Sequence, residues 1–323
     1  MHLRGDNKTM QGKLVRMLST GRAGTKFIAG AFADQGYTSY HEDLYIGEPT
    51  SAVMLYIHML GDLWKLDKDK YFSFESNFAQ PYVRVVTEKL ITYRDEAHQP
   101  VTKRIRDALV SQKVKPKPGF VVHTAHILTA ATPLIERELE RSSIESRNLI
   151  LLRNPLRTIH ALYIVEGGLV KGERPYRMFP ASFSGDETFI GAADIWANTY
   201  RMAFDQKEYF GQDKFQLLEL ETFSKDTDYA ANIFDFIELN FDPSRYKNFT
   251  KRELNKPLRS SKRDSLRNSH VFHKPDFVFS SKEIQRIYVQ IQDVIELYGI
   301  DWGNCVEEYQ QFHAKEKSQI GFD

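Results

Sequence analysis

A glycine-containing loop combines the residue types that bind a phosphate or a sulfate. Its sequence is Ser19-Thr20-Gly21-Arg22-Ala23-Gly24-Thr25-Lys26. It lies between two apolar runs, residues 14–18 and 27–32, an order typical of a buried strand, a turn and a helix. Such a turn directs backbone N–H groups and the positive end of the helix at one point. Because the glycines let the backbone approach closely, and Arg22 and Thr25 add donors, the sequence predicts an anion site.

The spacing of this loop differs from that of a Walker A motif, which has a Gly, four residues, and then Gly-Lys-Ser/Thr. Only two residues separate Gly21 from Gly24, and Thr25 precedes Lys26. This order counts against a Mg²⁺-dependent nucleotide or small-molecule kinase, which stays open as an alternative. An ordinary strand-to-helix turn without a ligand is the other alternative that the loop alone allows.

A second cationic segment, Arg153-Asn154-Pro155-Leu156-Arg157, directly follows the apolar run at residues 148–152. Asn as a cap and Pro in the first turn are typical of a helix start. Arg153 is therefore expected at the carboxyl end of a strand, where open α/β sheets bind ligands. A guanidinium there is shaped to bind a phosphate through two hydrogen bonds, although pairing with a surface carboxylate is the alternative.

A third basic stretch, residues 256–263, contains Arg259, Lys262 and Arg263 with few acids nearby. The chain resembles the PAPS-dependent sulfotransferases, which use 3′-phosphoadenosine-5′-phosphosulfate. The resemblance lies in the order of three elements: the glycine-containing loop, the Arg-x-Pro element and the late basic loop. The resemblance loosely covers residues 13–300 and is closer to bacterial members. It implies a P-loop-like sulfotransferase fold, which is α/β with a central parallel sheet flanked by helices and a helical insertion.

The resemblance also implies the cofactor contacts. PAPS would donate a sulfuryl group and leave as PAP, with no metal. The residues implied for the 5′-phosphosulfate are Gly21, Arg22, Ala23, Gly24, Thr25 and Lys26, and those for the 3′-phosphate are Arg153, Arg157, Arg259, Lys262 and Arg263. Phe27 is a candidate contact for adenine. The family has a Ser eight residues beyond the distal Arg, whereas this chain has Ala161. That difference keeps a nonenzymatic PAP-binding protein open as a further alternative.

Sulfuryl transfer requires a base that takes the acceptor's proton and donors that stabilise the leaving phosphate. Lys26 suits the second task. For the base, Glu42 in Tyr40-His41-Glu42 is favoured and His41 is second, since bacterial members resemble this chain in placing a Glu soon after the phosphate-loop helix. His123 and His126 in His123-Thr124-Ala125-His126 are the other candidates, because cytosolic members place their catalytic His near this point.

The acceptor is expected to be a small organic molecule, such as a natural product, that offers a hydroxyl or a nitrogen. Glu75, in an apolar stretch, is a candidate for orienting it. Trp64 is a second candidate contact, with the acceptor or with adenine, although the sequence favours a place in the core for both Trp64 and Phe27.

The elements that would position these residues alternate between strand and helix. Buried strands are predicted at residues 14–18, 120–123, 149–152 and 215–220, with a short one ending near Tyr40, and helices at 132–139, 192–204 and 229–239. Ser280 and Glu283 form a capping box for a C-terminal helix that Gly299 ends. We expect a flexible segment at 1–12, one domain at 13–303 with a helical wall or lid at 44–113, and a peripheral tail at 304–323.

Composition narrows the class of protein. The 323 residues carry a net charge of +1, which argues against a nucleic-acid-binding protein. Cys305 is the one cysteine, so no intrachain disulfide forms and a reducing, cytoplasmic location is expected. No apolar run is long enough to span a bilayer, so no membrane partner is expected. The sequence leaves the oligomeric state open.

Overall fold

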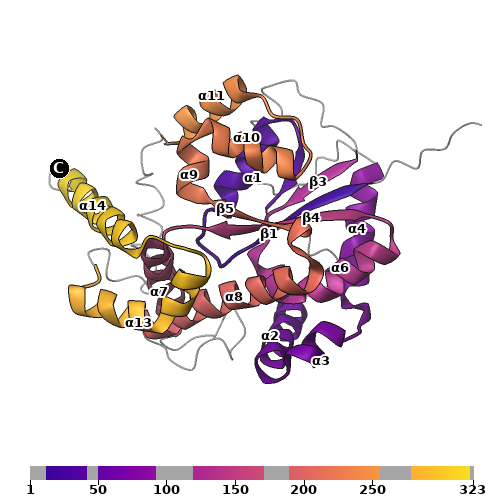
Figure 1. The fold of residues 1–323 in the computed structure, drawn as a ribbon, viewed down its shortest axis with the longest axis horizontal. Helices are drawn as coiled ribbons and strands as arrows, with labels where there is room; N and C mark the ends of the chain where they lie inside the picture. Colours follow the sequence, from indigo (N-terminus) through magenta and orange to yellow (C-terminus); the bar gives the residue numbers. More distant parts are fainter. Residues whose placement is uncertain (1–11, 42–49, 92–118, 171–188, 255–277, 321–323) are drawn as a thin grey trace, which may run out of the picture.

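The structure is a computed structural model that describes residues 12–41, 50–91, 119–170, 189–254 and 278–320. Within these residues five strands form one sheet in the order β2-β3-β1-β4-β5, and all neighbours are parallel (Figure 1). The strands are β1 (Lys13–Leu18), β2 (Thr38–Tyr40), β3 (Phe120–His123), β4 (Glu145–Leu152) and β5 (Phe215–Glu219). The prediction of a central parallel α/β sheet is therefore confirmed.

Helices connect the strands and cover both faces of the sheet. The α-helices are α1 (Thr25–Asp34), α2 (Thr50–Leu66), α3 (Lys68–Ser73), α4 (Gln80–Ile91), α6 (Thr132–Arg141), α7 (Pro155–Val170), α8 (Phe189–Phe210), α9 (Leu220–Lys225), α10 (Thr227–Phe236), α11 (Pro243–Leu254), α13 (Ser281–Leu297) and α14 (Trp302–Ile320). Short 3₁₀ helices are η1 (Asn77–Ala79), η2 (His126–Ala131) and η4 (Gln212–Lys214). None of the helices in the described ranges is long and apolar enough to cross a bilayer.

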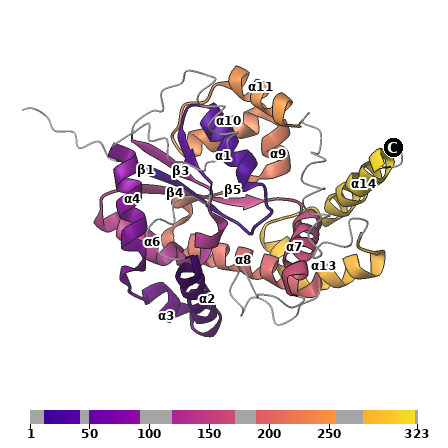
Figure 2. The ribbon, with the colours of Figure 1, turned by 180° about the vertical axis from the view of Figure 1, so that it is seen from behind.

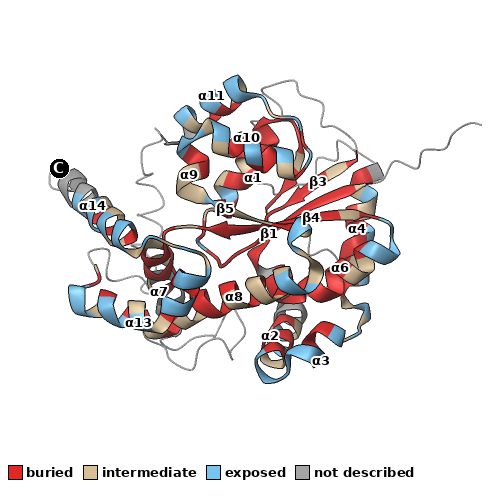
Figure 3. Cartoon of the chain, in the orientation of Figure 1, coloured by how far each residue is buried: buried red, intermediate tan, exposed pale blue. Residues whose placement is uncertain are grey.

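Alternate residues of β1 enter two separate hydrophobic cores. Val15 and Met17 pack with α1, α10 and α11 on one face, whereas Leu14 and Leu18 pack with α2, α4, α6 and α8 on the other. Figures 1 and 2 show these two helical layers, and Figure 3 shows that burial is concentrated along the strands. A central strand that is buried on both faces is typical of a parallel sheet. Packing on both faces holds β1 in place, and with it the position of the loop that follows β1.

A polar cluster lies inside the second of these cores. Arg16 on β1 pairs with Glu136 on α6 through Nη1 and Oε1 at 3.3 Å, and both side chains are buried. The other Glu136 oxygen accepts from Ser146 Oγ at 2.5 Å, and Oε1 accepts from Asn148 Nδ2 at 3.1 Å. Removing Arg16 or Glu136 would leave an uncompensated buried charge, so this ion pair fixes α6 against β1.

The C-terminal part differs from the sequence-based prediction. Residues 304–323 were predicted to be a peripheral tail, but α14 continues to Ile320 and packs against α7. Cys305, Tyr309 and His313 are buried, and they recur every four residues on one side of the helix. The predicted capping box at Ser280 and Glu283 is present at the start of α13.

The parallel topology determines where chemistry can occur. All five strands present their carboxyl ends at the same edge of the sheet. The segments that follow β2, β3, β1, β4 and β5 therefore lie next to one another in that order. Ligand sites in open α/β sheets occupy this edge.

Candidate functional site

The loop after β1 has the conformation of an anion-binding turn. Arg22 has a φ of 67° and Gly24 a φ of 99°, so two left-handed residues stand close together before α1. Such turns direct successive N–H groups into one concavity. Gly24 is the N-cap of α1 and offers no side-chain cap. The Phe27 N–H donates to Gly24 O at 2.9 Å, so the N–H groups that the described residues leave available in the first turn are those of Thr25 and Lys26. These features fit the phosphate end of a nucleotide.

The charges of this loop lie at the surface. Arg22 and Lys26 are both exposed. In the part of the chain that the structure describes, no carboxylate pairs with either side chain. Thr25, the first residue of α1, is buried. The described residues therefore leave the positive charge of the loop without a paired carboxylate.

Close packing explains the glycine at position 24. A Cβ added there would lie 2.4 Å from Leu220 Cδ2. Leu220 begins α9, directly after β5, so the loop packs against the segment two strands away from β1 in the sheet. A residue with a side chain would have to displace Leu220 and adopt a φ that L-residues rarely take.

The second cationic segment meets the loop. Arg153 follows β4, and its Nη1 donates to the backbone oxygen of Arg22 over 2.7 Å. Asn154 Oδ1 accepts from the backbone N–H of Arg157 at 3.2 Å, and Pro155 is the first residue of α7. The helix start predicted from Asn154 and Pro155 is confirmed. The two cationic segments that lie 131 positions apart in the sequence are thus in contact.

A carboxylate that the sequence analysis did not identify holds the distal arginines. Glu221 Oε1 lies 3.9 Å from Arg153 Nε and 3.5 Å from Arg157 Nη1. Glu221 Oε2 accepts from the backbone N–H of Asn154 at 3.2 Å. Burial and the neighbouring Arg157 lower the pKa of Arg153 to about 10, while Glu221 opposes that shift. Arg153 is therefore still charged at neutral pH.

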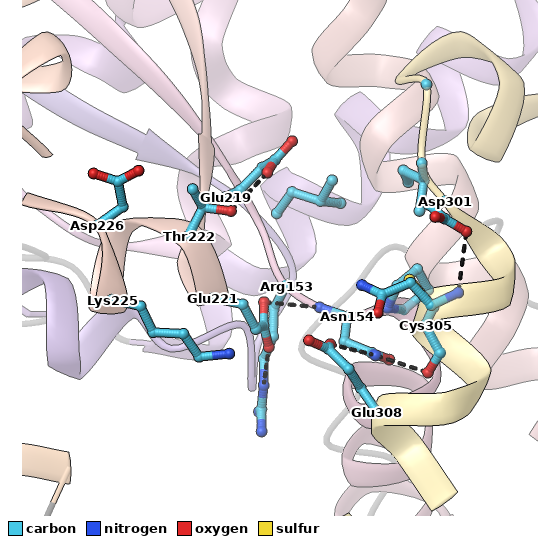
Figure 4. A pocket seen from close by; sticks show the side chains of 15 residues that line it. Arg153, Asn154, Glu219, Glu221, Thr222, Lys225, Asp226, Asp301, Cys305 and Glu308 are labelled. Atoms are coloured by element: carbon cyan, nitrogen blue, oxygen red, sulfur yellow. Dashed lines mark hydrogen bonds and ion pairs between the residues drawn. The ribbon is translucent and has the colours of Figure 1, made fainter. Parts of the chain in front are cut away.

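On its far side Arg153 borders a cavity of about 470 Å³ between α9 and α14 (Figure 4). Glu221 and Lys225 reach toward Arg153 from α9, and Cys305 and Glu308 belong to α14. Carboxylates outnumber cations in its wall, which contains Glu219, Glu221, Asp226, Asp301 and Glu308 beside Arg153 and Lys225. This wall disfavours an anion, so the side of Arg153 that suits a phosphate is the side facing the loop.

Asn154 ties α14 to this region. Its Nδ2 donates to the backbone oxygen of Cys305 at 2.9 Å and lies 3.2 Å from Glu308 Oε2. Burial, reinforced by the carboxylate of Glu308 and its acidic neighbours, raises the pKa of the Cys305 thiol to about 12. The thiol is therefore protonated at neutral pH, and α14 contributes structure here rather than a nucleophile.

The candidate bases lie on the other side of the loop. His41, directly after β2, is buried, and its Nδ1 lies 3.1 Å from Thr124 Oγ1 and 3.2 Å from Thr124 O. A proton on Nδ1 would leave Nε2 with the lone pair of a base. Thr129 Oγ1 accepts from the Ser19 N–H at 3.3 Å and donates to the backbone oxygen of His126 at 2.8 Å, which joins the start of the loop to η2.

His123 has a different setting from His41. It is buried, and its Nδ1 lies 2.9 Å from the hydroxyl of Tyr82 on α4. It pairs with Arg16 in the register of β1 and β3, so it belongs to the face that carries the buried polar cluster. These contacts favour a structural part for His123.

Several predicted site residues lie apart from this edge or outside the described ranges. Trp64 is buried in the core, and its Nε1 donates to Asp205 Oδ2 at 2.8 Å. The Glu75 side chain is 75% exposed and lies 3.5 Å from Arg141, so its setting is solvent rather than the apolar one expected. Phe27 packs on Phe249, with ring centroids 5.2 Å apart. Glu42, Arg259, Lys262 and Arg263 lie outside the described residues.

Of three comparisons with known proteins, the one with solved structures gives matches. No protein-family model matches the chain, and no curated protein sequence matches it. Three similar solved structures are sulfotransferases. A sulfotransferase domain of the Synechococcus PCC 7002 olefin synthase is 13% identical over 90% of this chain and 96% of its own, with a TM-score of 0.46.

The other two structures come from mouse and Mycobacterium avium. Mouse sulfotransferase SULT7A1, solved in complex with PAP, is 11% identical over 94% of this chain and 89% of its own, with a TM-score of 0.44. Sulfotransferase STF9 from Mycobacterium avium is 12% identical over 88% of this chain and 77% of its own, with a TM-score of 0.42. At these levels of similarity the function has to be argued from the residues of the site.

Proposed function

We propose that this protein is a sulfotransferase that moves a sulfuryl group from PAPS to a hydroxyl or nitrogen of a small organic acceptor. The observation that carries the proposal is the 2.7 Å hydrogen bond from Arg153 Nη1 to Arg22 O. It supports one continuous anion site, since a loop of backbone donors and a distal guanidinium meet at the same sheet edge. A ligand with two separated phosphates matches that arrangement.

The residues present fit the two phosphate ends. The uncapped start of α1, with Arg22 and Lys26 at the surface, suits the 5′ end. Arg153 suits the 3′ end, and Arg157, which lies near the same Glu221 oxygen, is our candidate for the donor that replaces the hydroxyl missing at Ala161. PAPS supplies an activated sulfuryl group when bound. The loop amides, Arg22 and Lys26 would stabilise the charge that grows on the departing phosphate.

We propose Glu42 as the base that takes the acceptor's proton, with His41 second. Both follow β2, which is separated from β1 only by β3. The contacts of His41 Nδ1 with Thr124 support a fixed ring orientation. His126 remains a third candidate through its link to the start of the loop.

Binding and transfer can be tested separately. Isothermal titration should show that PAP binds without Mg²⁺ and more tightly than ATP with Mg²⁺. Preference for ATP with Mg²⁺ would instead support a kinase. Tight PAP binding together with no transfer from PAPS to any member of a panel of phenols, alcohols and amines would support a nonenzymatic binding protein.

The base is tested by Glu42→Gln, which we expect to lower turnover by about a hundredfold or more while PAP affinity stays the same. His41→Gln and His126→Gln serve as parallel variants in the same transfer assay. A Glu42→Gln enzyme with full turnover would exclude Glu42, and the histidine variant with the larger loss would then identify the base.

A further inference from the structure

The guanidinium of Arg153 is held by two different parts of the chain. Its Nη1 donates to the Arg22 carbonyl at 2.7 Å, and its Nε faces Glu221 Oε1 at 3.9 Å. No described residue pairs with Nη2, which keeps two N–H donors for a ligand. A planar guanidinium that is hydrogen-bonded at Nη1 and faces a carboxylate at Nε has a preferred orientation, so the direction of the remaining donors is biased before any ligand binds.

Arg22, whose carbonyl oxygen accepts this hydrogen bond, has an unusual backbone conformation. Arg22 has a φ of 67°, a conformation that costs a non-glycine residue free energy. Its carbonyl oxygen is directed at Arg153, while its N–H belongs to the loop that precedes α1. The contact with Arg153 therefore stabilises the conformation that shapes the first anion site.

We propose that Arg153 couples the two ends of the anion site. The guanidinium that receives the distal phosphate also holds the phosphate loop in its binding conformation, and Glu221 is the positioning residue that orients it for both tasks. The identity of the ligands rests on the proposed function, but the contact between Arg153 and the loop does not.

The coupling can be measured first without a ligand. In Arg153→Met the amides of residues 21–25 should exchange their hydrogens about threefold to tenfold faster than in the wild type, because one hydrogen bond to the loop is lost. Arg157→Met is the matched control, because Arg157 also lies beside Glu221 and carries the same charge. Its substitution removes that charge but, among the described residues, no hydrogen bond to Arg22. Unchanged exchange in Arg153→Met, or an equal change in Arg157→Met, would overturn the proposal.

The second measurement uses adenosine 5′-phosphate, which can occupy the loop but lacks the distal phosphate. Arg153→Met should weaken its binding by about threefold to tenfold, and Arg157→Met by less than about twofold. If Arg153 acted on the distal phosphate alone, adenosine 5′-phosphate would bind both variants equally. Should the wild type bind neither this ligand nor PAP, the proposed function fails, and hydrogen exchange still decides the coupling.

Glu221→Gln tests whether Glu221 orients Arg153 or only balances its charge, because the two explanations predict opposite changes in PAP affinity. Removing a negative charge beside the site would by itself strengthen the binding of PAP. Loss of the orientation of Arg153 would weaken it, and we expect PAP affinity to fall by about threefold. Stronger PAP binding by Glu221→Gln would show that Glu221 only balances the charge of Arg153, and it would overturn the proposal that Glu221 orients Arg153. Glu219→Gln, in the same cavity wall, is the control for carboxylate loss.

Discussion

The loop after β1 and the arginine after β4 both bring positive charge to one sheet edge, but they do so by different means. The loop relies on backbone N–H groups and on Arg22 and Lys26, which are exposed and have no carboxylate partner among the described residues. Arg153 is mostly covered and shares Glu221 with Arg157. The loop is thus suited to attract an anion, and the arginine to select one by geometry.

The largest expected effect tests the conformation of the loop. Gly24→Ala places a Cβ 2.4 Å from Leu220 Cδ2 at a φ of 99°. We expect PAP affinity to fall by about a hundredfold in isothermal titration, because strain and displacement of the loop cost roughly 3 kcal/mol.

Gly211→Ala is the matched control for this prediction. Gly211 has the same φ of 99° but lies before β5, at the amino edge of the sheet, and its added Cβ would meet the flexible side chain of Asp213. This variant should lower the melting temperature and leave PAP affinity unchanged. If both glycine variants lost affinity alike, the effect would be global destabilisation rather than loop geometry.

A smaller effect tests selectivity at the arginine. Arg153→Ala should weaken PAP binding by about thirtyfold, since a hydrogen-bonded charge is lost, and should weaken adenosine 5′-phosphate binding by less. Arg147→Ala is the control, because Arg147 also lies on β4 but pairs with Glu145 and Glu238 away from the site. Equal losses for the two ligands would contradict the assignment of Arg153 to the distal phosphate.

Asn154→Ala tests the attachment of α14 to the distal end. The variant loses the cap of α7 and the hydrogen bond to the backbone of Cys305. We expect a loss of about 1 kcal/mol in the free energy of unfolding, seen as a melting temperature roughly 3 °C lower. Hydrogen exchange should increase in α14 but not in the loop after β1. Equal increases in both would mean that the two ends are not distinct structural units.

The smallest expected effect concerns the acidic cavity. The Cys305 thiol, with its pKa raised to about 12, should react slowly with iodoacetamide at pH 8, and PAP should change that rate by less than about twofold. Mass spectrometry of the alkylated peptide gives the rate, with the urea-unfolded protein as reference. Strong protection by PAP would place the ligand in the cavity rather than on the loop side of Arg153.

The secondary structure of the core strands and of the loop could be predicted from the sequence, because it depends on neighbouring residues in the chain. The apolar run before Ser19 and the two glycines after it predict strand, turn and helix without any distant partner. Asn154 and Pro155 define the start of α7 in the same way, and the structure confirms the cap. The position of Arg153 at the same sheet edge as the loop followed from topology, since parallel strands end at a common edge. The hydrogen bond from Arg153 to the Arg22 carbonyl was not predicted.

The remaining features depend on contacts between segments far apart in the sequence. Nothing in the local sequence around Glu221 distinguishes it from a surface carboxylate; it faces Arg153 because β5 lies beside β4. Glu75 was misjudged because its apolar neighbours turn inward while its own side chain does not. The tail was underestimated even though Cys305, Tyr309 and His313 recur every four residues, which is a helical pattern.

Because β1 lies in the middle of the sheet, the residues proposed as bases and the residues proposed to bind the distal phosphate lie on opposite sides of it. The candidate bases follow β2 and β3 on one flank, and Arg153 and Glu221 follow β4 and β5 on the other. Under the proposed function, substitutions on the first flank would change the choice of acceptor and leave the binding of PAPS unchanged. A search for new acceptors that starts from this proposal would randomise the residues after β2 and β3 and keep those after β4 and β5.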